Sequence, residues 1–155
     1  MNLLSTFLVF IAGLALGQTQ PVDREALWKE VAEAEKKGRP KTAAAKLQTI
    51  YDSALKEGKH AEAIKALAKR ITHEGAVQGS KPEEKITRLQ DEIDMVPVEA
   101  KPLLETVLGH WYWQYFQQNR YRFMQRTATA EPLGKDFTTW DLPRLYREID
   151  LHFTN

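Results

Sequence analysis

Apolar residues recur at helical spacing through most of the chain, and glycine or proline interrupts each run. Asp23 can cap a first amphipathic segment, and Pro40 is placed in the first turn of a second. A glycine follows each of the first three segments, where the left-handed conformation that ends a helix is easiest to adopt. The predicted helices, with their terminating glycines, are residues 24–37 (Gly38), 40–57 (Gly58) and a third that reaches about Glu74 (Gly75).

Further helices follow in the second half of the chain. The run Ser80-Lys81-Pro82-Glu83 resembles a capping box with a first-turn proline, and it predicts a helix to about Asp94. Residues 127–137 have no usable period and read as a loop. Thr139 can cap a last helix from Trp140 to about Phe153, with Leu142, Leu145, Tyr146 and Ile149 directed inward.

The most apolar helix is predicted from Val98 or Glu99 to about Asn119. Seven aromatic residues lie between Trp111 and Phe123. One stripe comprises Leu104, Val107, Leu108, Trp111 and Tyr115, and a second comprises Trp113, Phe116, Arg120 and Phe123. A helix that is apolar on more than one side is usually buried among its neighbours. We therefore expect this aromatic helix to be the hub of the fold.

A weak internal repeat links the first three helices. The spacing Ala34-x3-Gly38-x4-Ala43-x3-Leu47 recurs as Ala54-x3-Gly58-x4-Ala63-x3-Leu67. These corners are similar to those of tetratricopeptide hairpins, although their offset is not the period of about 34 residues that a regular array requires. The sequence thus predicts an all-α fold of about six helices in antiparallel hairpins, with tetratricopeptide-like corners, around the aromatic-rich helix.

The beginning of the chain reads as a secretory signal peptide. Residues 3–16 are apolar but fewer than the roughly 20 that a membrane span needs, and Ala15-Leu16-Gly17 supplies the small residues of a cleavage site. No lysine or arginine precedes the run, which leaves an uncleaved anchor as the alternative. We expect a signal peptide at 1–17, a helical module at 18–155 that begins a longer protein, export to the periplasm, cell surface or medium, and no membrane span after cleavage.

Composition argues against most chemistry. The formal net charge of +1 gives no electrostatic case for nucleic acid or an anionic membrane. The chain has no cysteine, and its four histidines have no metal-ligand spacing, so neither a metal nor a cofactor is expected. Acidic groups such as Glu83-Glu84 read as a solvated helix face, and His73 and His110 have no nucleophile near them in sequence. An enzyme is therefore not supported.

Two clusters are candidates for binding a partner. Arg120, Arg122 and Arg126 alternate with aromatic residues and could hold single-stranded RNA, but a packed core with arginines at its edge is favoured. Trp140 could anchor a protein partner, or it could pack back onto the aromatic helix, with Asp141 at a helix N-terminus. We retain Trp140, Arg120 and Arg122 as possible docking residues.

Several stretches together resemble a known family. They are Leu27-Trp28-Lys29-x-Val31, residues 35–43 (Glu-Lys-Lys-Gly-Arg-Pro-Lys-Thr-Ala), Ile50-Tyr51-x2-Ala54-x-Lys56-Glu57-Gly58, residues 113–127 around Asn119-Arg120-Tyr121-Arg122-Phe123, and Thr139-Trp140-Asp141-Leu142-x2-Leu145-x2-Glu148-Ile149. In this order, after a signal peptide, they resemble the N-terminal helical region of large bacterial alpha-2-macroglobulin-family proteins. The resemblance covers nearly all of the mature chain.

This resemblance implies protease trapping or inhibition by the whole protein, with β-sandwich domains after the helical region and, in some members, a Cys-Gly-Glu-Gln thioester. The present residues contain no cysteine, no bait-like segment and no β-sandwich pattern, so no functional residue of the family can be transferred. The expected role is scaffolding or docking. The expected partners are the remaining domains of the same chain or a periplasmic protein, with proteases as targets of the family. The alternative is a stand-alone tetratricopeptide-like interaction module in the periplasm.

Overall fold

The chain folds into helices alone, within the residues that the computed structural model describes, which are 22–79, 81–126, 134 and 136–154. This confirms the predicted all-α class. The expected signal peptide and its cleavage site lie outside these residues. The elements are α1 (Arg24–Lys36), α2 (Pro40–Lys56), α3 (His60–Gln78), α4 (Glu84–Asp91), η1 (Val98–Ala100), α5 (Lys101–Met124), η2 (Phe137–Thr139) and α6 (Leu142–Thr154), where η denotes a 3₁₀ turn.

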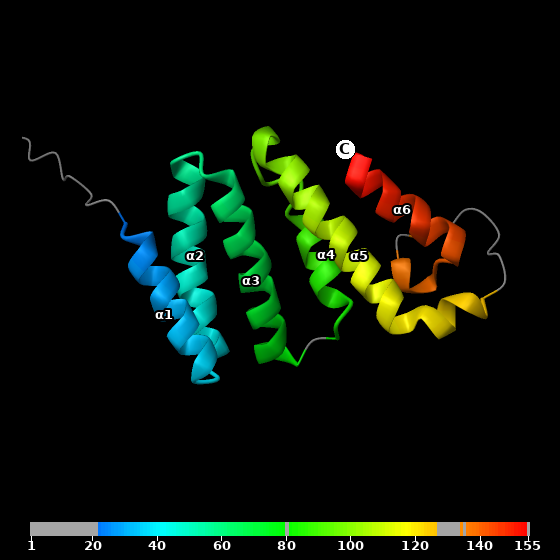
Figure 1. The fold of residues 1–155 in the computed structure, drawn as a ribbon, viewed down its shortest axis with the longest axis horizontal. Helices are drawn as coiled ribbons and strands as arrows, with labels where there is room; N and C mark the ends of the chain where they lie inside the picture. Colours follow the sequence, from blue (N-terminus) through cyan, green and yellow to red (C-terminus); the bar gives the residue numbers. More distant parts are fainter. Residues whose placement is uncertain (1–21, 80, 127–133, 135, 155) are drawn as a thin grey trace, which may run out of the picture.

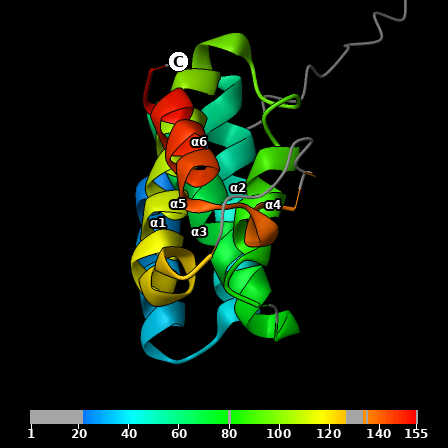
Figure 2. The same ribbon diagram turned by 90° about the vertical axis from the view of Figure 1, so that its right-hand side faces the viewer.

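The helices lie side by side in chain order, from α1 at one end of the molecule to α6 at the other (Figure 1). Helix α2 packs between α1 and α3, whereas α5 contacts α3, α4 and α6. Figure 2 views the molecule from the α6 end, where α6 lies in front of α5. No helix in the described part of the chain has both the length and the apolar character to span a membrane.

The two corners that the internal repeat predicted have the same hydrogen-bond pattern. In the first, the N–H of Gly38 donates to the carbonyl of Glu35, and the N–H of Arg39 donates to the carbonyl of Ala34. In the second, Gly58 and Lys59 donate in the same way to Leu55 and Ala54. Both glycines have positive φ, at 60° and 68°. Each corner is a Schellman motif, so the glycine is required by backbone conformation rather than by space.

Outside α5, three helix ends differ from the sequence-based prediction. Helix α3 does not end at Gly75 but continues to Gln78, where Gly79 adopts φ of 65° and closes it. Helix α4 ends at Asp91 rather than Asp94, and the chain continues in hydrogen-bonded turns through Glu92 to Val96. Ser80, the first residue of the predicted capping box, lies outside the described residues.

The start of the last helix is the third difference. Residues Phe137–Thr139 form the 3₁₀ turn η2, which the Asp136 side chain caps by accepting from the Thr138 N–H at 3.0 Å. Asp141, not Thr139, caps α6: its carboxylate accepts from the N–H of Arg144 at 2.9 Å. An aspartate suits this position because it meets the orphan N–H groups at the positive end of the helix dipole.

Helix α5 is largely buried and longer than expected, but it is not the hub of the whole fold: it packs against α3, α4 and α6, whereas α1 packs against α2 and α2 against α3. The helices form a row, and in a row no single helix is surrounded by all the others. The buried residues of α5 come from several sides of the helix: Leu104, Leu108, Gly109, Trp111, Tyr112, Tyr115, Phe116 and Phe123. The helix continues past Asn119 to Met124, with a kink at Asn119 (φ −114°, ψ 17°). The Asn119 amide donates to the carbonyl of Tyr115 at 2.9 Å, which offers the backbone a side-chain partner at the kink.

The α5–α6 pair is in close contact at a glycine. A Cβ on Gly109 would lie 3.2 Å from two ring carbons of Phe153 and 3.3 Å from the Cβ of His152. The absence of a side chain at Gly109 therefore lets the end of α6 approach α5 closely. Phe153 of α6 is therefore held against Gly109, which precedes Trp113 by one turn of α5.

Candidate partner-binding surface

Trp140, one of the predicted docking residues, lies in the core. Its side chain is 4% exposed, and its indole N–H donates to the carbonyl of Gly134 at 2.7 Å. The Trp140 ring stacks on that of Tyr112, with centroids 6.2 Å apart. The guanidinium of Arg144, a residue of α6, lies 4.7 Å from the centre of the Trp140 ring. Trp140 is therefore packed back onto the aromatic helix, which is the structural one of the two interpretations of its sequence context. It does not lie on an open surface.

The arginines of α5 differ from one another in their surroundings. Arg126 joins the end of α5 to the segment before α6, since its guanidinium donates at 2.6 Å to the carbonyls of both Thr138 and Trp140. Arg122 is exposed and donates to the Thr138 carbonyl at 3.4 Å. Arg120 is also exposed. Arg120 and Arg122 therefore lie at the surface, but the buried Trp140 does not join them in one exposed site.

A different set of rings forms an exposed surface along α5 and α6. Trp113, Tyr146 and Phe153 are 41%, 42% and 54% exposed, respectively. Phe116, which is buried, joins two of them: its ring centre lies 5.5 Å from that of Trp113 and 5.1 Å from that of Tyr146. Phe153 packs against Gly109. We call Trp113, Phe116, Tyr146 and Phe153 the aromatic strip.

The sequence contained part of the signal for this strip. The helical periodicity predicts that Trp113 and Phe116 belong to a second apolar stripe of the aromatic helix and that both stripes are buried. Phe116 is buried, but Trp113 is not. Tyr146 was expected to point inward with Leu145 and Ile149, whereas it is half exposed. Tyr146 and Phe153 are seven residues apart on α6, which is two helical turns, and so they share a flank beside the buried face.

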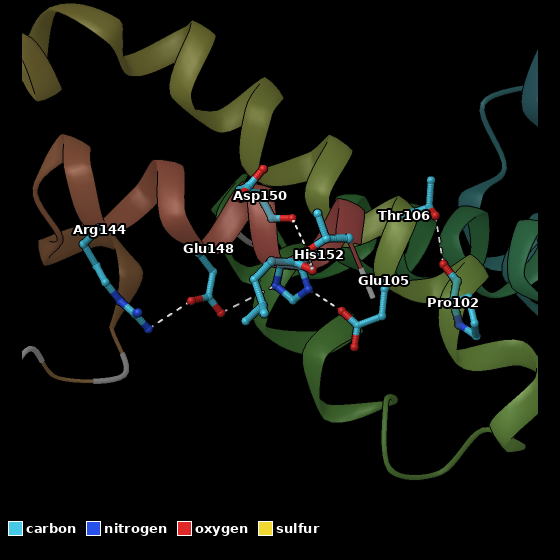
Figure 3. Close-up of polar contacts among 9 residues, drawn as sticks. Pro102, Glu105, Thr106, Arg144, Glu148, Asp150 and His152 are labelled. Carbon is cyan, nitrogen blue, oxygen red and sulfur yellow. Dashed lines mark hydrogen bonds and ion pairs between the residues drawn. The ribbon is translucent and has the colours of Figure 1, made fainter.

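A buried polar cluster holds α6 against α5 (Figure 3). His152, 6% exposed, reaches from α6 to α5, where its Nδ1 is hydrogen-bonded to the carboxylate of Glu105. Its Nε2 lies 3.6 Å from the Glu148 carboxylate, which also pairs with Arg144 at 2.9 Å. The two carboxylates lie on either side of the ring and orient it. The contact between His152 and Glu105 sets the position of α6 along α5.

Tyr112 packs against the same histidine. Its ring is fully buried and stacks on His152 with centroids 5.5 Å apart. Burial, followed by the charge of Glu148, raises the pKa of the Tyr112 hydroxyl well above its usual value. A phenol in such a position stays neutral at physiological pH, so its contribution is packing rather than proton transfer. The stacking of Tyr112 on His152 and the bond from His152 to Glu105 join α5 and α6, which is a structural role.

Further ionisable groups have polar partners, most of them on another helix. Glu92 pairs with Arg70 of α3 at 2.9 Å, and His73 lies 2.8 Å from the Glu35 carboxylate of α1. His110 contacts Gln114 one turn along α5. Within the part of the chain that the structure describes, no group of three or more histidine and acidic side chains could hold a metal ion.

Comparisons with known proteins give no relative for this chain: no family model matches it, and no curated protein or solved structure is significantly similar to it.

Proposed function

We propose that this chain is an exported helical module that binds protein through the aromatic strip and so has a scaffolding or docking role. The carrying observation is the set of three half-exposed rings, Trp113, Tyr146 and Phe153, on one flank of the α5–α6 pair. Large aromatic side chains are the commonest anchors of protein interfaces, because they bury much area at little cost in conformational entropy. The packing around Phe116 and Gly109 holds these rings in place before a partner arrives.

The resemblance to bacterial alpha-2-macroglobulin-family proteins suggests what the module serves. In that reading it is the leading helical part of a protease inhibitor, and its partner is the remainder of the same protein. The trapping chemistry would then lie in other domains, which agrees with the lack of cysteine in these residues. The second candidate, a stand-alone periplasmic interaction module, is supported by the two tetratricopeptide-like corners at Gly38 and Gly58.

Site-specific photo-crosslinking tests the proposal in the native host. A photoreactive phenylalanine analogue replaces Tyr146 in the aromatic strip, and in a matched control it replaces the exposed Lys41 at the start of α2. We expect one protein segment to be captured reproducibly at position 146 and not at position 41. Equal products at both positions, or none at position 146, would contradict a protein-binding role for this surface.

The captured peptide separates the two versions of the proposal. A segment encoded downstream in the same reading frame, in β-rich sequence, supports the leading module of an inhibitor. A segment of a different protein supports the stand-alone interaction module.

A further inference from the structure

We infer that the aromatic strip receives an acidic amphipathic helix of a partner protein, an inference that rests on the proposed protein-binding function. It concerns which chemistry the surface recognises, not whether it binds. Three observations support it: the charge around the strip, the position of α6 in the row of helices, and the spacing of the exposed apolar side chains.

The charge around the strip is positive along α5. Beyond Trp113 on α5, Arg120 and Arg122 are exposed, whereas Arg126 is bonded to the carbonyls of Thr138 and Trp140. On α6 the exposed Asp150 lies between Tyr146 and Phe153, so the positive charge is concentrated at the Trp113 end of the strip. Arg120 follows Trp113 by seven residues, or two helical turns, and both side chains are exposed. An arginine guanidinium can pair with a carboxylate through two parallel hydrogen bonds. A partner with carboxylates at the end of an apolar face would complement this arrangement.

The position of α6 suggests a helix as the partner element. Helix α2 is covered on two sides by α1 and α3, and α5 by α3, α4 and α6. Helix α6, in contrast, packs mainly against α5, at the end of the row (Figure 2). A further helix laid beside the α5–α6 pair would repeat the packing that already joins each inner helix to its neighbours.

The spacing of exposed apolar side chains fits the same element. Trp113 and the 63%-exposed Met124 are eleven residues apart on α5, about 16 Å at about 1.5 Å per residue. Tyr146 and Phe153 span about 10 Å on α6 by the same rise. A helix that presents apolar residues at positions i, i+4 and i+7 covers about 10 Å, which matches the span from Tyr146 to Phe153.

Single-stranded RNA fits the surface less well. The rings of Trp113 and Tyr146 are each in contact with Phe116, so they are not free platforms for successive bases. The exposed arginines of α5 lie near one end of the strip rather than along it, and the whole chain has a net charge of only +1. An anionic membrane surface is disfavoured for the same reason of charge.

Two synthetic helices of about three turns, with leucine at the same i, i+4 and i+7 positions, test the inference. One carries glutamate at the flanking positions and the other carries lysine. Binding of each labelled peptide to the purified chain is measured by fluorescence anisotropy at several salt concentrations. The variant is Arg120→Glu with Arg122→Glu, and the control is Lys41→Glu with Lys81→Glu, an equal change of charge on exposed lysines elsewhere.

We expect the glutamate peptide to bind at least about tenfold more tightly than the lysine peptide, with affinity falling as salt rises. The arginine variant should lose this preference and the lysine control should retain it. Circular dichroism verifies folding, and Arg120→Gln with Arg122→Gln replaces the variant if charge reversal prevents folding.

Equal binding of the two peptides, or equal loss in the variant and its control, would overturn the inference. So would arginine-dependent binding of polyuridine or of phosphatidylglycerol vesicles without binding of the glutamate peptide. If position 146 captures a partner segment that is not acidic, the protein-binding function stands and the acidic-helix inference fails.

Discussion

Trp140 and Trp113 show how residues of one type serve different purposes in this chain. Trp140 is 4% exposed and has a hydrogen-bond partner for its indole N–H, so its ring and its polar atom are both used by the fold. Trp113 is 41% exposed, and its ring packs against that of Phe116. The first tryptophan therefore stabilises the junction of η2 and α6, while the second remains available to a partner.

Replacing each tryptophan by alanine should separate these roles. Trp140→Ala should lower the free energy of unfolding by about 3–5 kcal/mol, because it leaves a cavity beside Tyr112. Trp113→Ala should cost about 1 kcal/mol or less, since much of its ring is already in water. Urea unfolding followed by circular dichroism measures both. Equal losses would contradict the assignment of Trp140 to the core and Trp113 to the surface.

At the scale of elements, glycine marks helix ends only where the backbone requires positive φ. The three described glycines with positive φ are Gly38, Gly58 and Gly79. Gly75 is helical and precedes Gly79 by one turn. The sequence pattern predicts the end of α3 at Gly75, and that prediction is wrong. The apolar pattern stops near Gly75, but the N–H of Gly79 still bonds to the carbonyl of Gly75, and the helix includes the intervening residues.

Two alanine substitutions distinguish these glycines. Gly79→Ala should destabilise the protein by about 1 kcal/mol, because alanine is strained in the left-handed region. Gly75→Ala should stabilise it by up to about 1 kcal/mol, because Gly75 lies inside α3 and alanine favours the helical conformation over glycine. Thermal unfolding measures both changes. If Gly75→Ala destabilised the protein and Gly79→Ala stabilised it, the helix would end at Gly75 instead.

At the scale of the whole molecule, charged side chains connect helices that are not adjacent in sequence. Arg24 of α1 pairs with Glu57 at the end of α2 at 2.7 Å and with Glu62 of α3 at 2.9 Å. At the other end of the same helices, Glu35 of α1 bonds to Lys69 and His73 of α3, each at 2.8 Å. Helix α1 is therefore fixed to α3 at both ends, which sets its orientation across α2.

The pairing of Glu35 predicts how stability changes in acid. The hydrogen bond from Lys69, and then that from His73, holds the pKa of Glu35 below its usual value of 4.5. The unfolded chain then binds the proton more readily, so this contribution is complete above about pH 4.5 and is lost as pH falls through the folded pKa. For a carboxylate with partial solvent access the contribution should be no more than about 1 kcal/mol.

Unfolding in urea at several pH values between neutrality and pH 3 measures this dependence. Glu35→Gln should reduce the loss of stability as pH falls below 4.5, and Lys69→Met should also reduce this loss. Combining the two changes should add little to either one alone, because both remove the same pair. Additive losses would show that Glu35 and Lys69 act independently.

The sequence by itself determined the all-α class, the corners at Gly38 and Gly58, and the apolar character of the aromatic helix. These features depend on local causes, namely helical periodicity and the backbone freedom of glycine, which are present in the residues themselves. It did not determine which of the rings would be exposed. Trp113 and Phe116 belong to the same stripe of α5, and only the placement of α6, fixed by Gly109 and His152, leaves Trp113 at the edge while burying Phe116. Burial depends on the neighbours that tertiary packing supplies, so the aromatic strip could be recognised only in the folded chain.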